Sequence, residues 1–315
     1  MNVLVTGSSG FVGSHLVRRL QEDGHHLVRP MDVKWPKGYT ITEVDHTWLR
    51  DIRDKDIENI YHEIDTVVHC AAMVDEATCL ANIPGAIDVN VTGMVNVLQY
   101  CVTRKIKRFI FISSAEVYGH CTEEVREFVP LTPITICGAT KLMAEYFVND
   151  FHRRFGIDTV ILRPFNIYGP DVNIGEKPLS IIARFIRNLM EDEKLPIYNE
   201  GKDVRDFIFI DDVIDAILIA INTANRDVIG DTFNLATGNS INMIQLAKMI
   251  SNKMEKKFEV EFLSERRDEA RYSVGNPSHA TDVLRFSTKT DLVDGIMETI
   301  KWMSTVTFVP RKEKV

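Results

Sequence analysis

A glycine-rich segment close to the N-terminus has the spacing and the setting of a phosphate-binding loop. The sequence TGSSGFVG at residues 6–13 follows a short β-branched run and opens a helix-period run, the context in which a glycine pattern indicates a dinucleotide site. We expect Gly7 to permit the tight turn, Gly10 to let the backbone approach a pyrophosphate, and Gly13 to let helix and sheet pack closely. The N–H groups at the start of the helix would then face the phosphates.

Acidic residues follow at places suited to the adenosine half of such a ligand. Asp32 ends the second apolar run, where a carboxylate accepts hydrogen bonds from ribose hydroxyls and repels a 2′-phosphate. The sequence therefore predicts NAD as the cofactor and not NADP. We expect the pair Asp51 and Ile52 to contact the adenine.

The N-terminal half has the alternation of strands and helices that would position these groups. Short runs rich in β-branched residues predict strands at residues 2–6, 27–31, 66–69, 109–113 and 159–163. Helix-period segments lie between them, at residues 11–23, 84–103 and 139–155. This alternation predicts an α/β fold with a doubly wound parallel sheet of the Rossmann type. Beyond Pro164 the pattern loosens, which indicates a second, smaller α/β lobe.

Composition and charge exclude several other classes of protein. With 315 residues, 45% of them hydrophobic, the chain is too apolar to be disordered and long enough for two domains or one large α/β unit. The net charge of −8 disfavours nucleic acids and anionic membranes as partners. No apolar stretch reaches the roughly 20 residues of a membrane span, and the five cysteines include no CxxC pair. We therefore expect a cytoplasmic protein with no metal, disulfide framework or secretory signal.

Motifs along nearly the whole chain resemble those of the extended short-chain dehydrogenases/reductases, in particular the NAD-dependent nucleotide-sugar epimerase/dehydratase family. These motifs are TGSSGFVG at 6–13, HCAA at 69–72, DVNVTG around Asn90, SSAEVYG at 113–119, GATK at 138–141, RPFNIYGP at 163–170, RDFIFIDDV at 205–213, FNLATG at 233–238 and Trp302. The resemblance implies a Rossmann-type NAD-binding domain from residues 1–164 plus about 205–233, and a nucleotide-sugar-binding lobe from about 165–204 and 234–315. It also implies a homodimer formed through helices 84–103 and 139–155.

The same resemblance assigns roles to individual positions. The cofactor-binding positions are Gly7, Ser9, Gly10, Phe11, Val12, Gly13, Asp32, Asp51, Ile52, Ala71, Ala72, Asn90 and Lys141. The substrate-binding positions are Ser114, Asn166, Arg205 and Arg266, and both arginines would hold the diphosphate of a nucleotide-diphosphate sugar. Lys141 would also lower the pKa of a neighbouring acid–base group, while Ser114 would hydrogen-bond the reacting sugar hydroxyl.

One position departs from the family pattern. The family places a tyrosine proton acceptor four residues before the lysine, and this chain has Cys137 there. Neither Tyr118 nor Tyr146 has the spacing to replace it. Three interpretations stay open. Cys137 is a thiolate base whose pKa is lowered by a helix N-terminus, Lys141 and the nicotinamide; it is a small filler while Glu116 or a water molecule moves the proton; or the site is inactive.

The residues after Ser114 bear on the outcome of the reaction. Family 4,6-dehydratases have an Asp-Glu pair there, which protonates the leaving hydroxyl and abstracts the C5 proton, whereas this chain has Ala115 and Glu116. The missing acid favours a 4-epimerase that oxidises the sugar at C4. The alternatives are a nucleotide-sugar 4-dehydrogenase, an atypical dehydratase that uses Glu116, and a non-catalytic NAD-binding paralogue.

Overall fold

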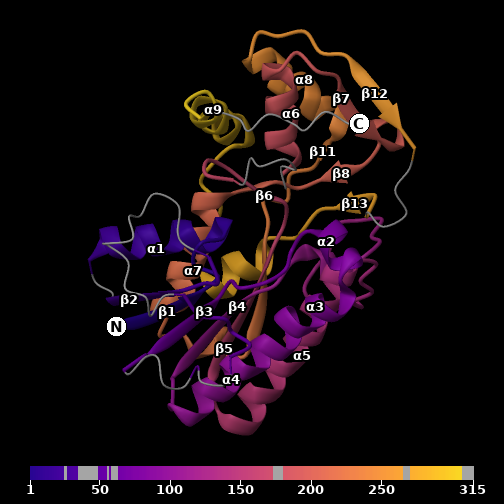
Figure 1. Cartoon of the computed structure of the whole chain (residues 1–315). Helices are drawn as coiled ribbons and strands as arrows, with labels where there is room; N and C mark the ends of the chain where they lie inside the picture. The colour runs from indigo at the N-terminus through magenta and orange to yellow at the C-terminus, as the bar shows by residue number, and fades with distance from the viewer. Residues whose placement is uncertain are drawn as a thin grey trace.

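The chain forms a large parallel sheet covered by helices on both faces, with a second, smaller lobe beside it (Figure 1). The computed structural model describes residues 1–24, 27–34, 49–54, 57, 63–172, 180–264 and 270–306. The strands of the large sheet are mostly buried along their length, because helices exclude water from both faces.

Six strands form the large sheet in the order β10-β5-β4-β3-β1-β2, all parallel. They are β1 (Asn2–Thr6), β2 (Leu27–Met31), β3 (Thr66–His69), β4 (Arg108–Ile112), β5 (Asp158–Pro164) and β10 (Asp231–Leu235). The chain runs from β1 to β2 on one side and continues with β3 on the other, so the strand order reverses beside β1. Ligands of such sheets bind at the carboxyl ends of the strands next to this reversal. The predicted Rossmann-type fold is confirmed, and β10 adds a strand that we did not predict.

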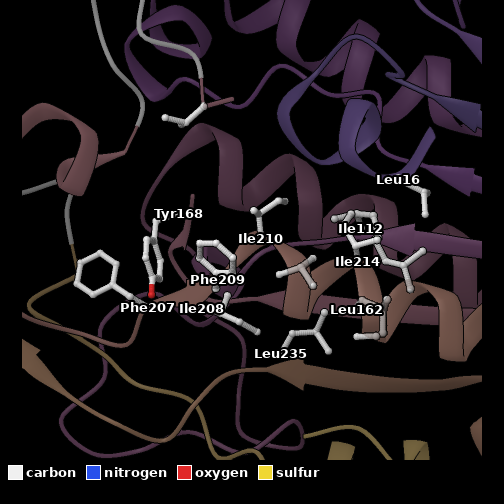
Figure 2. Packing of buried hydrophobic residues seen from close by; sticks show 14 of the residues in the cluster. Leu16, Ile112, Leu162, Tyr168, Phe207, Ile208, Phe209, Ile210, Ile214 and Leu235 are labelled. Carbon is white, nitrogen blue, oxygen red and sulfur yellow. The ribbon is translucent and has the colours of Figure 1, made fainter. Parts of the chain in front are cut away.

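Helices cover the two faces of the sheet in pairs (Figure 1). They are α1 (Phe11–Asp23) and α7 (Ile210–Asn222) on one face, and α4 (Met94–Thr103) and α5 (Ile136–Phe155) on the other. Neighbouring residues of β1 point to opposite faces of the sheet. Val3 packs in the core with α1 and α7, and Leu4 packs in the core with α4 and α5. Figure 2 shows Ile214 of α7 lying close to Ile112 and Leu162 of the central strands.

The second lobe is built from short strands and three helices. Its elements are β6 (Ile167–Tyr168), α6 (Ile181–Met190), β7 (Leu195–Tyr198), β8 (Val204–Arg205), β9 (Ile208–Phe209), β11 (Ile241–Asn242), α8 (Met243–Lys253), β12 (Val260–Leu263), β13 (Tyr272–Ser273) and α9 (Leu292–Met303). Tyr168 lies edge-on to Phe207 and Phe209, with ring centroids 6.2 and 5.5 Å apart (Figure 2). One continuous hydrophobic core joins this lobe to the large sheet, and it fixes the two relative to each other.

The segment predicted as one helix over residues 84–103 is divided in the structure. After α2 (Glu76–Ala81), it consists of α3 (Ile83–Ile87), a π-helical turn η3 (Asp88–Gly93) and α4. The Asn82 side chain begins α3 by accepting the N–H of Gly85 at 3.1 Å. The π-helical turn carries Asn90, which is buried. The backbone keeps right-handed helical angles at Ile87, Asp88, Gly93 and Met94, so the predicted helix is present and contains a π-helical turn that we did not predict.

Helix α5 starts three residues before the predicted 139–155 segment. Thr135 is its N-cap, and the hydroxyl accepts the N–H of Gly138 at 2.8 Å. Gly156 ends the helix with a φ of +70°, a conformation that glycine adopts without strain. Short helical turns complete the chain at η4 (Ala115–Tyr118), η5 (Asn199–Gly201), η6 (Arg226–Val228) and η7 (Ala280–Leu284). The early start places Cys137 in the first turn of α5.

Candidate active site

The glycine-rich loop after β1 packs directly against the segment that follows β3. Gly7 has a φ of +70°, and a Cβ atom there would lie 2.5 Å from the backbone nitrogen of Ala71, which Ala72 follows. Gly10 donates its N–H to the carbonyl of Gly7 at 3.0 Å. Phe11, Val12 and Gly13 form the first turn of α1, whose start has no side-chain cap. This cradle of backbone atoms, which has no room for a side chain at Gly7, fits the pyrophosphate of a dinucleotide.

Asp32 lies beside the loop at the carboxyl end of β2. Its Oδ2 accepts the N–H of Ser9 at 2.9 Å, and its Oδ1 accepts the N–H of Lys34 at 3.1 Å. A half-buried carboxylate at this place fits the adenosine ribose of NAD and opposes the extra phosphate of NADP. The chain's residues therefore fit the predicted cofactor.

Three other predicted cofactor positions are engaged with protein groups. Asp51 pairs with Arg53 at 2.6 Å, and this guanidinium lowers the pKa of the Asp51 carboxyl. Ile52 is buried. Asn90 accepts the N–H of Met73 at 2.6 Å and donates to its carbonyl at 2.9 Å. Asn90 thus fixes the segment after β3, and direct contact of Asp51, Ile52 and Asn90 with the cofactor stays a prediction.

Ser114 and Lys141 reach the same end of β4 from different elements. Lys141 of α5 donates from Nζ to the carbonyl of Ile112 at 2.6 Å, and its Nζ lies 4.9 Å from the ring centroid of Phe111. Burial lowers the pKa of the Lys141 ammonium. Ser114 follows two residues after Ile112, and its hydroxyl accepts the N–H of Glu116 at 3.1 Å, which caps η4. The structure therefore brings a serine hydroxyl and a buried cation together beside the glycine loop.

Glu116 is open to solvent, yet protein atoms crowd its carboxyl group. The hydroxyl of Thr135 donates to Glu116 Oε2 at 2.7 Å. Burial of the carboxyl, with the negative charge of Glu76, raises the pKa of Glu116, while hydrogen bonds from Thr135 and Cys137 and the charge of Lys141 favour its charged form. Glu116 therefore combines access to solvent with a raised pKa, and its contact with a ligand stays a prediction.

Cys137 lies one helical turn before Lys141, and its thiol faces protein. The residue is 2% exposed, and Sγ lies 3.8 Å from the carbonyl of Met73 in a small cluster with Cys79. Burial raises the pKa of the thiol, and the negative charge of Glu116 adds to the effect. Lys141 does lower this pKa, but burial outweighs it. The protein groups therefore raise the pKa of the thiol, and the interpretation of Cys137 as a thiolate base, which includes the charge of the nicotinamide, stays a prediction.

The sequence as a whole identifies the family. The sequence model described as "NAD dependent epimerase/dehydratase family" matches residues 3–236. This chain belongs to that family. Its members are NAD-dependent, so the cofactor prediction and the resemblance inferred from the motifs are confirmed.

Similar proteins cover almost the whole chain. The "Putative UDP-glucose 4-epimerase" of Methanocaldococcus jannaschii is 28% identical over 305 residues, with 96% of this chain and 98% of that protein covered. The UDP-glucose 4-epimerase of Mycolicibacterium smegmatis is 28% identical over 312 residues, covering 96% and 98%. The crystal structure of a UDP-glucuronic acid 4-epimerase from Bacillus cereus, in complex with UDP-glucuronic acid and NAD, matches with a TM-score of 0.88 and 28% identity, covering 96% and 99%.

No nearby tyrosine takes the place that the epimerase/dehydratase family gives to its proton acceptor. Tyr118 donates to Asn234 Oδ1 at 2.6 Å and accepts from Arg163 at 2.8 Å, and burial raises the pKa of Tyr118 to about 12. Tyr146 lies on the outer side of α5 with 68% of its surface exposed. The Tyr118 hydroxyl is therefore engaged by buried protein groups, and Tyr146 faces solvent.

Two of the predicted substrate-binding residues, Asn166 and Arg205, belong to the second lobe or adjoin it. Asn166 donates to the carbonyl of Asp206 at 2.6 Å, and Arg205 donates to the carbonyl of Val204 at 3.0 Å. Arg266 lies outside the described residues. We did not predict a role for Asp206, whose buried carboxylate accepts the N–H of Thr237 at 3.1 Å and anchors this segment. Contact of Asn166, Arg205 and Arg266 with substrate stays a prediction.

A buried ion pair that we did not predict joins α5 to β5 next to Ser113. Arg163 contacts both carboxylate oxygens of Glu145, at 2.9 Å from Nε and 2.6 Å from Nη2. Ser113 also donates its hydroxyl to Glu145. Glu145 follows Lys141 by four residues, so a charged residue in the buried stripe of the helix was the available signal.

Two kinds of feature are absent from the described part of the chain. In those ranges no group of three or more His, Cys, Asp and Glu residues is arranged to hold a metal ion. Among the helices described, none combines the length and the apolar character needed to span a membrane.

Proposed function

We propose that this chain is a UDP-sugar 4-epimerase in which Glu116, in place of the missing tyrosine, takes the proton from the sugar C4 hydroxyl. The names of the similar proteins support the substrate class and the reaction. The arrangement of Ser114, Glu116 and Lys141 at one end of β4 supports the chemistry.

NAD would lie along the glycine loop, with Asp32 at the adenosine ribose and Lys141 at the nicotinamide ribose. When bound, it accepts and returns the hydride of sugar C4. Lys141 contributes a fixed positive charge at the end of β4, since its Nζ is already anchored on the carbonyl of Ile112. This anchoring limits the reorganisation needed when negative charge develops on the sugar oxygen.

The chain's own residues would handle the proton. Ser114 hydrogen-bonds the C4 oxygen, and the Glu116 carboxylate accepts the proton of that hydroxyl and later gives it back. The raised pKa of Glu116 suits this exchange, because a more basic carboxylate removes a hydroxyl proton more readily. Cys137 then has the role of a small buried filler.

The single observation that carries this assignment is the contrast between Glu116 and Cys137. Glu116 is exposed to solvent, whereas the Cys137 thiol is buried and has a raised pKa. Ala115 offers no acid to protonate a leaving hydroxyl, which favours epimerisation over elimination of water. The buried Lys141 favours an active enzyme over a non-catalytic paralogue, because a buried cation costs stability without such a use.

The predicted homodimer is part of the proposal. Apolar side chains are exposed on the two helices that would form its interface: Ile83 and Ile87 on α3, and Met143, Tyr146 and Phe147 on α5. An exposed group of this kind favours a protein partner, and the same faces on a second copy would cover it. The five cysteines are all free thiols, which suits the predicted cytoplasmic location.

The test is incubation of the purified protein and NAD with UDP-glucose, UDP-glucuronic acid, UDP-N-acetylglucosamine and dTDP-glucose in separate reactions. NMR spectroscopy of the sugar identifies the products. We expect one UDP-sugar to be converted to its C4 epimer without net formation of NADH. Accumulation of NADH with a keto-sugar would instead indicate a dehydrogenase, and four unchanged sugars would contradict the proposal.

A further inference from the structure

Thr135 links the start of α5 to the carboxylate of Glu116. Its hydroxyl oxygen accepts the N–H of Gly138 at 2.8 Å, and its single proton is donated to Glu116 Oε2 at 2.7 Å. The first bond fixes the hydroxyl on the helix end, so the second is directed at Glu116. A hydroxyl that donates to a carboxylate stabilises its charged form.

Glu76 approaches the same helix end from α2. Its Oε1 accepts the N–H of Ile136 and its Oε2 accepts the N–H of Cys137, both at 2.9 Å. Asp75 begins α2 by accepting the N–H of Thr78 at 2.9 Å, so Glu76 is not needed as the cap of its own helix. The carboxylate of Glu76 is therefore held at a fixed place on the first turn of α5.

We propose that Thr135 and Glu76 are opposed positioning residues for Glu116: the Thr135 hydroxyl favours its charged form and the fixed charge of Glu76 favours its neutral form. This inference rests on the proposed function in so far as Glu116 is the group that exchanges the proton. Its physical content, the protonation of Glu116 in the protein itself, is independent of turnover.

Charged and titratable groups of α2 and α5 act on Glu116, and α5 packs against η4. Glu76 belongs to α2, and Cys137 and Lys141 belong to α5. Glu76 raises the pKa of Glu116, whereas a hydrogen bond from Cys137 and the charge of Lys141 lower it. Burial raises it further, so the net direction is upward. Thr135 and Glu76 pull in opposite directions, and their removal must therefore shift the protonation of Glu116 in opposite directions.

The experiment follows the carboxyl signal of Glu116 by NMR of protein labelled at the glutamate side-chain carbonyl carbons, with Glu116→Gln to assign it. The variants are Thr135→Val, Thr135→Ser and Glu76→Gln, in the full chain without substrate. The matched control is Glu22→Gln, which removes the same charge from the exposed surface of α1 on the other face of the sheet. The pH profile of turnover is recorded for the same proteins.

We expect Thr135→Val to move the titration of Glu116 to higher pH and Glu76→Gln to move it to lower pH. Each change should alter the ratio of charged to neutral carboxyl by about tenfold at a fixed pH near the midpoint, the scale of one interaction with a charged group. Thr135→Ser should restore the wild-type titration, and Glu22→Gln should leave it unchanged.

A merely structural role for these residues would leave the titration where it is in every folded variant, and that result would overturn the inference. If Thr135→Val does not fold, Glu76→Gln still decides, because an unchanged or upward shift contradicts the proposal. Failure of the proposed function is recognised by a different result. In that case Glu116→Gln retains wild-type turnover, whatever the titration of Glu116 shows in the other variants.

Discussion

Replacing Glu145 by Gln removes the negative charge from a buried ion pair that lies beneath the site. Glu145 is 3% exposed and Arg163 is 4% exposed, and the carboxylate receives two hydrogen bonds from this arginine. In the variant the Arg163 guanidinium stays buried without this counter-charge, and its bonds to the Tyr118 hydroxyl and the Glu127 carbonyl are to neutral groups. Removing one member of a buried pair costs roughly 3–5 kcal/mol, because the remaining charge has lost water and no longer has a charged partner.

The structure supplies a matched control on the same helix. Asp150 pairs with Arg154 at 2.7 Å, but the arginine side chain is 70% exposed. Water and salt screen such a pair, so Asp150→Asn should leave the stability close to that of wild type. The two substitutions make the same chemical change on α5, and burial alone separates their expected effects.

Urea unfolding followed by circular dichroism measures both variants at neutral pH. We expect Glu145→Gln to lower the free energy of unfolding by several kcal/mol, at the scale of roughly 3–5 kcal/mol given above. A loss of less than about 1 kcal/mol, in the range of an exposed pair, would refute the reasoning. It would mean that Arg163 finds other partners as good as Glu145.

Three further changes test the cofactor loop, the choice of cofactor and the dimer. Gly7→Ala places a Cβ atom 2.5 Å from Ala71 N at a φ of +70°, so NAD affinity measured by calorimetry should fall at least about tenfold; unchanged affinity would contradict the cradle. Asp32→Ser removes the charge that repels a 2′-phosphate, and NADP affinity should rise relative to NAD; an unchanged ratio would remove Asp32 from the selection. Phe147→Glu places a charge on the exposed apolar face of α5, and light scattering should show monomers where the wild type shows dimers; an unaltered mass would place the interface elsewhere.

Sequence patterns located the sheet well, because β-branched runs between helix-period segments leave few alternatives. The predicted strands 2–6, 27–31 and 66–69 have the bounds of β1, β2 and β3. The segment 84–103 was harder, since the apolar pattern of a π-helical turn does not differ from that of the helices around it. The turn carries Asn90, which bonds to Met73, a tertiary contact that local spacing does not show.

The sequence allowed individual residues of the candidate site to be named, but it did not allow the pKa shifts of those residues to be predicted. Ser114 and Lys141 could be named because they match motifs of the family, in SSAEVYG and GATK. The pKa of Cys137 could not be predicted from the sequence. The helical spacing places Lys141 near the thiol, but it does not show that the thiol is buried or that Glu116 lies close to it, and both of these raise the pKa. Glu76 was missed for the same reason: 60 residues separate it from the helix end that it holds.

The central claim is that Glu116, and not Cys137, takes the proton from the sugar. The most direct measurement compares single-turnover rates of NAD reduction by the accepted UDP-sugar in wild type, Glu116→Gln and Cys137→Ser. We expect Glu116→Gln to slow this step by about 10²–10⁴-fold, the range for loss of a general base, and Cys137→Ser to stay within a few-fold of wild type. The opposite result, a fast Glu116→Gln and a slow Cys137→Ser, would contradict the account.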